Sequence, residues 1–121
     1  MLLVAAGLTV AVALMHSLLG GRRLIAPLLS WEGFPSILGA KERARVTLRF
    51  GWHLLSVNWV AMAGVLVLMH QVPALKSDAF LWMMSGVFGL SGLIAIIFSQ
   101  GRHLSWVMFL PVAVLCALAT G

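Results

Sequence analysis

Three of the four histidines have the side-chain type and the spacing that could bind a cofactor or a metal ion. His16 lies near the end of the first long apolar stretch, His53 near the start of the second, and His103 at the start of the fourth. If consecutive stretches cross a membrane in opposite directions, His16 lies about one helical turn and His53 about two turns from the same face. Ionisable side chains in membrane spans are costly and mark candidate functional sites. We therefore treat these three histidines as candidate cofactor ligands.

Two chemistries would use the histidines. A haem b held by His16 and His53 needs their nitrogens to converge on one iron, roughly 4 Å apart. A metal ion of unknown identity could add His103 as a third ligand. The alternatives are a structural role, in which each imidazole bonds a neighbouring helix, and a role in gating or proton transfer. No Asp or Glu lies in any apolar stretch, so proton relays lack their usual carboxylates.

Arginines near the same face form a second candidate site. Arg45, Arg49, His53 and Ser56 follow one another at helical spacing and share one helix face. Arg49 is the deepest of these cations, and either Glu42 or Glu32 could pair with it. Otherwise the arginines could bind a lipid headgroup or another anion, or extend toward the interface without a ligand. The candidate anion-binding residues are Arg22, Arg23, Arg45, Arg49 and Arg102.

Small and amide side chains predict where the helices pack. Ser85, Gly89 and Gly92 recur at three- and four-residue spacing, which lets helix backbones approach closely. Asn58 lies near the middle of the second span, where an unpaired amide is costly. We expect it to hydrogen-bond across helices, to Ser85, Ser91 or a second subunit.

Composition indicates a membrane protein. The 121 residues are 62% hydrophobic and 9% charged, against about 25% charged in soluble domains. Hydropathy predicts an all-α, four-helix integral membrane bundle that is a single domain over residues 1–121. The expected spans cover about residues 2–19, 46–69, 79–98 and 103–119.

Glycine, proline and a capping aspartate predict where the helices end or bend. Gly20 and Gly21 are expected to end the first span. A long basic connection over residues 20–45 follows, in which Pro27 interrupts any continuous helix and which could contain an interfacial helix. Asp78 is a candidate N-cap for the third span. Pro111 predicts a kink in the fourth.

The distribution of Lys and Arg predicts the topology. Seven of the eight fall in or beside the first and third connections, and only Lys76 lies in the second. Cytoplasmic loops carry excess Lys and Arg, so both termini are expected outside a bacterial inner membrane. The net charge of +5 is then explained by anionic lipid headgroups rather than by nucleic acid.

Enzyme motifs are missing. The chain has three acidic residues, one cysteine, no GxSxG and no phosphate-binding loop motif. Any catalysis would have to use His, Arg and a bound cofactor. The sequence therefore favours a protein that is not an enzyme.

Three short motifs carry a resemblance. They are HSLLGGRR at residues 16–23, LRFGWH at 48–53 and GRHLSW at 101–106. Together they resemble a family of small four-span bacterial inner-membrane proteins of uncharacterised function. Such proteins carry Glu where Gly21 stands here, and this departure removes an acid beside His16. The resemblance implies the topology and the choice of His16, Arg49, His53, Arg102 and His103, but no reaction.

These observations lead to an expected function and two alternatives. We expect a binding, interaction or accessory subunit of the membrane, alone or as a homo-oligomer. The first alternative is an electron-transfer protein that binds haem or a metal through its cytoplasmic-side histidines. The second is a small transporter or channel, although such transporters rely on an intramembrane acid that this chain lacks.

Overall fold

The first helix is longer than the sequence predicts. In a computed structural model that describes all 121 residues, α1 (Leu2–Leu14), η1 (Met15–Ile25) and α2 (Ala26–Ser30) form one continuous helix. The expected end at Gly20 and Gly21 is therefore wrong. The eleven residues of η1 are π-helical, and Pro27 is the second residue of α2, directly after this segment. The expected separate interfacial helix is instead the last part of this helix.

Three helices are long and apolar enough to cross a membrane by length and composition. They are Leu2–Ser30, α3 (Lys41–Gln71) and α4 (Asp78–Ser99). The chain contains no strand, so the predicted all-α class is confirmed. A short 3-10 turn, η2 (Pro73–Leu75), joins α3 to α4. Ser77, rather than Asp78, caps α4, since its hydroxyl accepts from the backbone N–H of Phe80.

The last helix is shorter than expected. α5 covers Trp106–Leu118, thirteen residues with Pro111 inside, so His103 lies before the helix rather than at its start. Gln100 and Gly101 adopt left-handed φ angles of 53° and 77° and reverse the chain after α4. The backbone N–H of His103 then donates to Ser99 Oγ at 3.0 Å. This turn delays the start of α5 by three residues.

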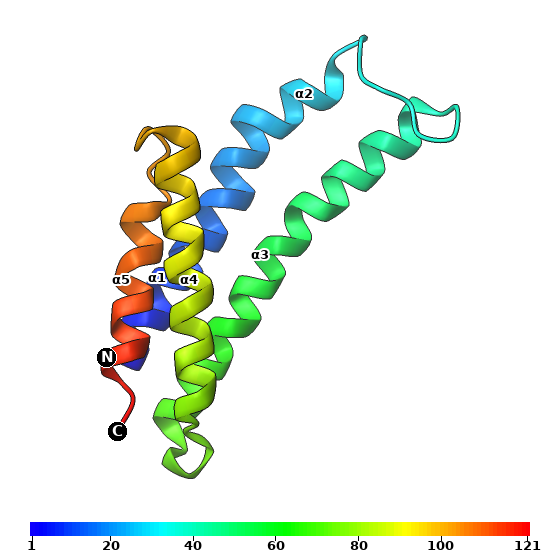
Figure 1. Cartoon of the computed structure of the whole chain (residues 1–121). Helices are drawn as coiled ribbons and strands as arrows, with labels where there is room; N and C mark the ends of the chain where they lie inside the picture. Colours follow the sequence, from blue (N-terminus) through cyan, green and yellow to red (C-terminus); the bar gives the residue numbers. More distant parts are fainter.

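The helices form two unequal regions (Figure 1). α1 packs against both α3 and α5, and α5 packs against α4. Their contacts enclose a core of 15 buried residues, among them Leu66, Phe88 and Val112. We call this region the bundle. The two chain ends lie at the same end of it, with the α3–α4 connection.

Two of the three glycines of α4 face α5. A Cβ added at Gly92 would lie 2.7 Å from Leu110 Cδ2, and one added at Gly89 would lie 3.7 Å from Ala113 Cβ. Gly92 therefore allows close approach of the two helices, whereas a methyl group at Gly89 would make an ordinary contact. Ser85 is half-buried on the same helix.

The second region extends beyond the ends of α4 and α5 (Figure 1). It consists of η1, α2, the loop over residues 31–40 and residues 41–56 of α3, and we call it the arm. Its core has only four buried residues, namely Ile25, Leu29, Phe34 and Ala44. The loop closes through a bridge between Ile37 and Ala40, with Leu38 and Gly39 at φ angles of 51° and 75°.

Candidate functional site

The π-helical segment sets which side chains face α3. In a π-helix each N–H bonds the carbonyl five residues earlier, so positions four and five apart share a face. His16, Gly20, Gly21 and Ile25 have this spacing within η1. The first three contact Trp52 or His53 of α3, and Ile25 packs in the arm core. The π-helical spacing therefore places these four residues on the side of η1 that faces α3, with His16 as the only polar side chain among them.

A chain of hydrogen bonds connects His16 and His53 through two serines. Ser17 donates its hydroxyl to Ser56 Oγ at 2.8 Å. His16 Nδ1 lies 3.0 Å from Ser56 Oγ, and His53 Nδ1 lies 3.0 Å from Ser17 Oγ. Because Ser17 uses its proton on Ser56, His53 Nδ1–H donates to Ser17, and the direction of the His16–Ser56 bond is set by the His16 tautomer. The network joins η1 to α3 through both imidazole rings.

Aromatic contacts hold His16 in place. Its ring stacks on Trp52 with centroids 3.9 Å apart and an interplanar angle of 12°. Trp59 contacts its edge at 5.1 Å, and the Trp52 indole N–H donates to the His16 carbonyl at 3.0 Å. Gly20 leaves room for this arrangement, because a Cβ there would lie 2.6 Å from Trp52 Cζ2. His16 is therefore packed as part of the helix interface.

His103 does not join the other two histidines. It bonds Ser105 Oγ at 2.8 Å in the α4–α5 turn, and no three His, Cys, Asp or Glu residues come close enough to hold a metal. The three-ligand site is therefore not formed. A haem between His16 and His53 stays a prediction, and because the serines bond both Nδ1 atoms, the Nε2 atoms would have to be the ligands.

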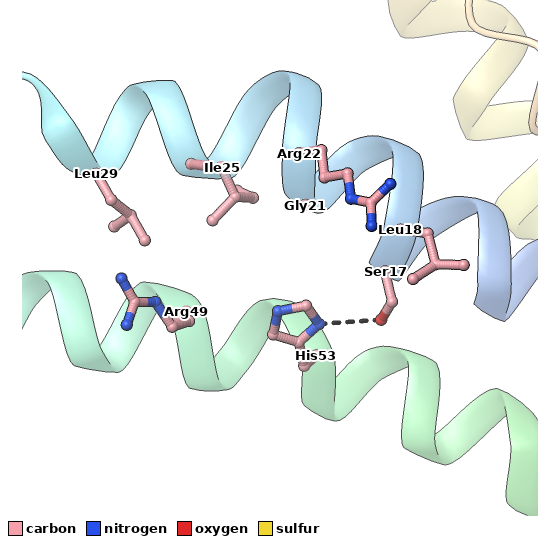
Figure 2. Close-up of a pocket in the computed structure, with 9 residues that line it drawn as sticks. Ser17, Leu18, Gly21, Arg22, Ile25, Leu29, Arg49 and His53 are labelled. Atoms are coloured by element: carbon pink, nitrogen blue, oxygen red, sulfur yellow. Dashed lines mark hydrogen bonds between the residues drawn. The ribbon is translucent and has the colours of Figure 1, made fainter.

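The arginines give the arm a groove between η1–α2 and α3 (Figure 2). Its volume is about 240 Å³, and its polar lining residues are Ser17, Arg22, Arg49 and His53. Arg22 extends from one helix near Leu18, and Arg49 extends from the other toward Leu29 (Figure 2). Its remaining lining residues are apolar, namely Leu18, Ile25, Ala26 and Leu29. The groove contains two guanidinium groups, which bind phosphate and carboxylate. Its hydroxyl, on Ser17, and the Nδ1 of its imidazole, on His53, are already hydrogen-bonded within the protein.

Neither groove arginine has an acidic partner. The only ion pair joins Arg45 to Glu42 at 3.8 Å, and no hydrogen bond is formed by the Arg22 or Arg49 side chain. Glu32 contributes its backbone carbonyl to Lys41 Nζ at 2.7 Å. Glu42 is therefore paired with Arg45, and neither Glu42 nor Glu32 forms an ion pair with Arg49.

The other candidate cations lie outside the groove. Arg45 contacts the Trp31 carbonyl at 3.5 Å, and its buried Nε has no partner. Arg23 and Arg102 are exposed, the first on η1 and the second in the α4–α5 turn. Only Arg22 and Arg49 of the five predicted cations line the groove.

Asn58 does not bond another helix within the chain. Its Nδ2 donates to the Leu54 carbonyl of its own helix at 3.0 Å, and the residue is exposed. Ser91 likewise bonds its own helix, at Val87. The predicted hydrogen bond from Asn58 of α3 to a serine of α4 is therefore wrong, because Asn58 lies on the outer face of α3. A contact with a second subunit stays a prediction.

Sequence reasoning missed two partners in the site, namely Ser17 and Trp52, and it placed Ser56 on the arginine face without linking it to His16. A signal was present, since Ser17 follows His16 directly and Ser56 lies one turn after His53 on the same helix face.

Comparisons of the chain with protein-family models, with curated proteins and with solved structures gave no match.

Proposed function

We propose that the chain is a four-span inner-membrane protein with both termini outside and the arm at the cytoplasmic face. The charge bias supports this orientation, because the arm and the α4–α5 turn carry seven of the eight Lys and Arg residues. The two termini share the opposite end of the bundle, as four spans require (Figure 1). α5 is thirteen residues long, about 20 Å, and its flanking residues and local thinning of the bilayer would complete the fourth span.

We further propose that the protein is a binding subunit for an anionic group at the cytoplasmic surface. The observation that carries this proposal is the pair Arg22 and Arg49, which enter one groove from two helices and lack any acidic partner. Both arginines are exposed and line the same groove from two helices. An anion in the groove would accept charge-assisted hydrogen bonds from guanidinium groups that no carboxylate occupies.

The depth of the arginines supports the same function. A hydrocarbon core of about 30 Å takes about 20 helical residues. Counted from Leu2, this length ends near Arg22, and counted back from His70 it ends near Phe50. Both groove arginines then lie at the level of the cytoplasmic headgroups, where phosphate is abundant.

Cysteine labelling tests the orientation. The single native cysteine, Cys116, is fully buried and gives little background. An impermeant thiol reagent added outside whole cells should label Lys76→Cys and leave Lys41→Cys unlabelled until the membrane is opened. The reverse pattern would overturn the proposed topology.

Thermal stabilisation tests the binding function. We use the purified protein in neutral detergent with glycerol 3-phosphate, a soluble phosphate ester, at constant ionic strength. The ester should raise the unfolding midpoint of the native protein and of Arg23→Ala and Arg43→Ala, which change exposed arm cations outside the groove. Arg22→Ala and Arg49→Ala should lose the rise. Equal responses in all four variants would mean nonspecific charge effects and would refute the groove.

A further inference from the structure

We infer that the anion is the headgroup of a negatively charged phospholipid of the cytoplasmic leaflet, whose acyl chain lies along α3. This inference rests on the proposed function and names the ligand of the same groove. A soluble phosphate ester shares the headgroup chemistry, so the structural question is what lies next to the arginines.

A second groove, open and lined by residues of α3 alone, adjoins the first. It has a volume of about 390 Å³ and is lined by Val46, Arg49, Phe50, His53, Leu54 and Val57. Arg49 and His53 line both grooves. The two cavities therefore meet at the cation that would bind the phosphate.

The second groove continues from Arg49 toward the bundle. Phe50, Leu54 and Val57 follow one another at i, i+4 and i+7, so they form one stripe on α3. All three are exposed, with 65% of Phe50 and 62% of Val57 accessible. In the proposed orientation this stripe leads from the headgroup level into the hydrocarbon core. A polar head at Arg49 and a chain on this stripe match the two ends of a phospholipid.

Charge complementarity selects among lipids. Arg22 and Arg49 together offer two positive charges with no acid in either groove. A zwitterionic headgroup would bring its own cation to this site, whereas a phosphodiester without an amine would not. His53 is held at the junction by its bond to Ser17, so one side of the headgroup site is preorganised (Figure 2).

The test compares a lipid with its soluble headgroup. We measure binding to the full protein in neutral detergent by native mass spectrometry and thermal shift. The probes are phosphatidylglycerol, phosphatidylcholine of the same chains, and glycerol 3-phosphate. We expect phosphatidylglycerol to bind at least about tenfold more tightly than either other probe, which corresponds to about 1.4 kcal/mol of binding free energy.

Variants separate the head from the chain. Arg22→Ala and Arg49→Ala should each weaken phosphatidylglycerol about tenfold, in line with one lost charge-assisted bond. Phe50→Ala and Val57→Ala should weaken phosphatidylglycerol about threefold and leave glycerol 3-phosphate unchanged. Phe98→Ala, which removes a phenylalanine that is 85% exposed on α4, serves as the matched control and should change neither.

The possible outcomes decide the inference and the proposed function separately. If glycerol 3-phosphate binds as tightly as phosphatidylglycerol, or Phe50→Ala weakens both equally, the lipid inference fails and the anion site stands. If phosphatidylcholine equals phosphatidylglycerol, the headgroup assignment is wrong. If no phosphate compound binds, or the groove variants match Arg23→Ala, both proposals fail.

Discussion

The bundle and the arm are built from the same helices but are stabilised in different ways. The bundle encloses 15 buried residues, and its fully buried side chains include Leu66, Leu81 and Phe88. The arm buries four hydrophobic residues and adds hydrogen bonds among His16, Ser17, His53 and Ser56. Only two helices form it, and they separate toward the loop (Figure 1).

This difference suggests a division of roles. The bundle packs around 15 buried residues, whereas the arm has four buried hydrophobic residues and a groove lined by two arginines without acidic partners. Directional bonds at the base of the arm hold its helices at a fixed separation without filling the space between them. The bundle then anchors the protein, and the arm presents the site.

The largest effect is expected from emptying the bundle core. Phe88 is 1% exposed and packs against Phe109 with ring centroids 5.7 Å apart. Phe88→Ala should lower the free energy of unfolding by about 3 kcal/mol, because it leaves a cavity. Phe98→Ala on the same helix should cost little, since that ring is 85% exposed. Similar losses in a detergent unfolding titration would contradict the described core.

The next effect concerns the junction of the two regions. Gly20→Ala places a methyl group 2.6 Å from the Trp52 ring, which is held by its stack on His16. Moving that ring should cost about 1–3 kcal/mol of unfolding free energy. Gly21→Ala is the matched control, because its Cβ would lie 3.5 Å from His53. Equal stability of the two variants would argue against the π-helical register.

A smaller effect is expected from the hydrogen bonds of the arm. Ser56→Ala removes the bonds to His16 and Ser17 together and should cost about 1 kcal/mol. Ser91→Ala removes only a bond to its own helix and should change unfolding by less than about 0.5 kcal/mol. The detergent unfolding titration described for Phe88→Ala measures the free energy of unfolding of both variants. A silent Ser56→Ala would mean that the polar network does not hold the arm.

The smallest effect is expected at Asn58. Its exposed amide bonds only its own helix, so Asn58→Leu should shift the unfolding free energy by less than about 0.5 kcal/mol. Unfolding measured across a range of protein concentrations checks this expectation. A larger loss that depends on concentration would instead show that Asn58 contacts a second subunit.

The fold class could be predicted because hydropathy depends on composition over long windows. The ends of the helices could not, since they depend on local geometry. Gly20 and Gly21 would end an α-helix, but in η1 they lie within π-helical turns and give space to Trp52 and His53. His103 lies outside α5 because two left-handed residues reverse the chain before it.

The candidate site could be predicted from the sequence only in part, because its depth depends on residue counts and its contacts depend on local geometry. Depth along a helix follows from counting residues, and counting placed His16 and His53 at a similar level. Which side chains meet depends on helix rotation, and a π-helical segment changes that rotation. The serine links and the pairing of Arg22 with Arg49 in one groove therefore required the structure.

The most direct test of the anion site is a double-mutant cycle on Arg22 and Arg49. The affinity for phosphatidylglycerol is measured for the native protein, Arg22→Ala, Arg49→Ala and the double variant in neutral detergent. If one phosphate bridges both guanidinium groups, the double variant should lose clearly less than the two single losses combined. Fully additive losses would mean that the arginines act on separate anions, and unchanged affinity in all variants would contradict the site.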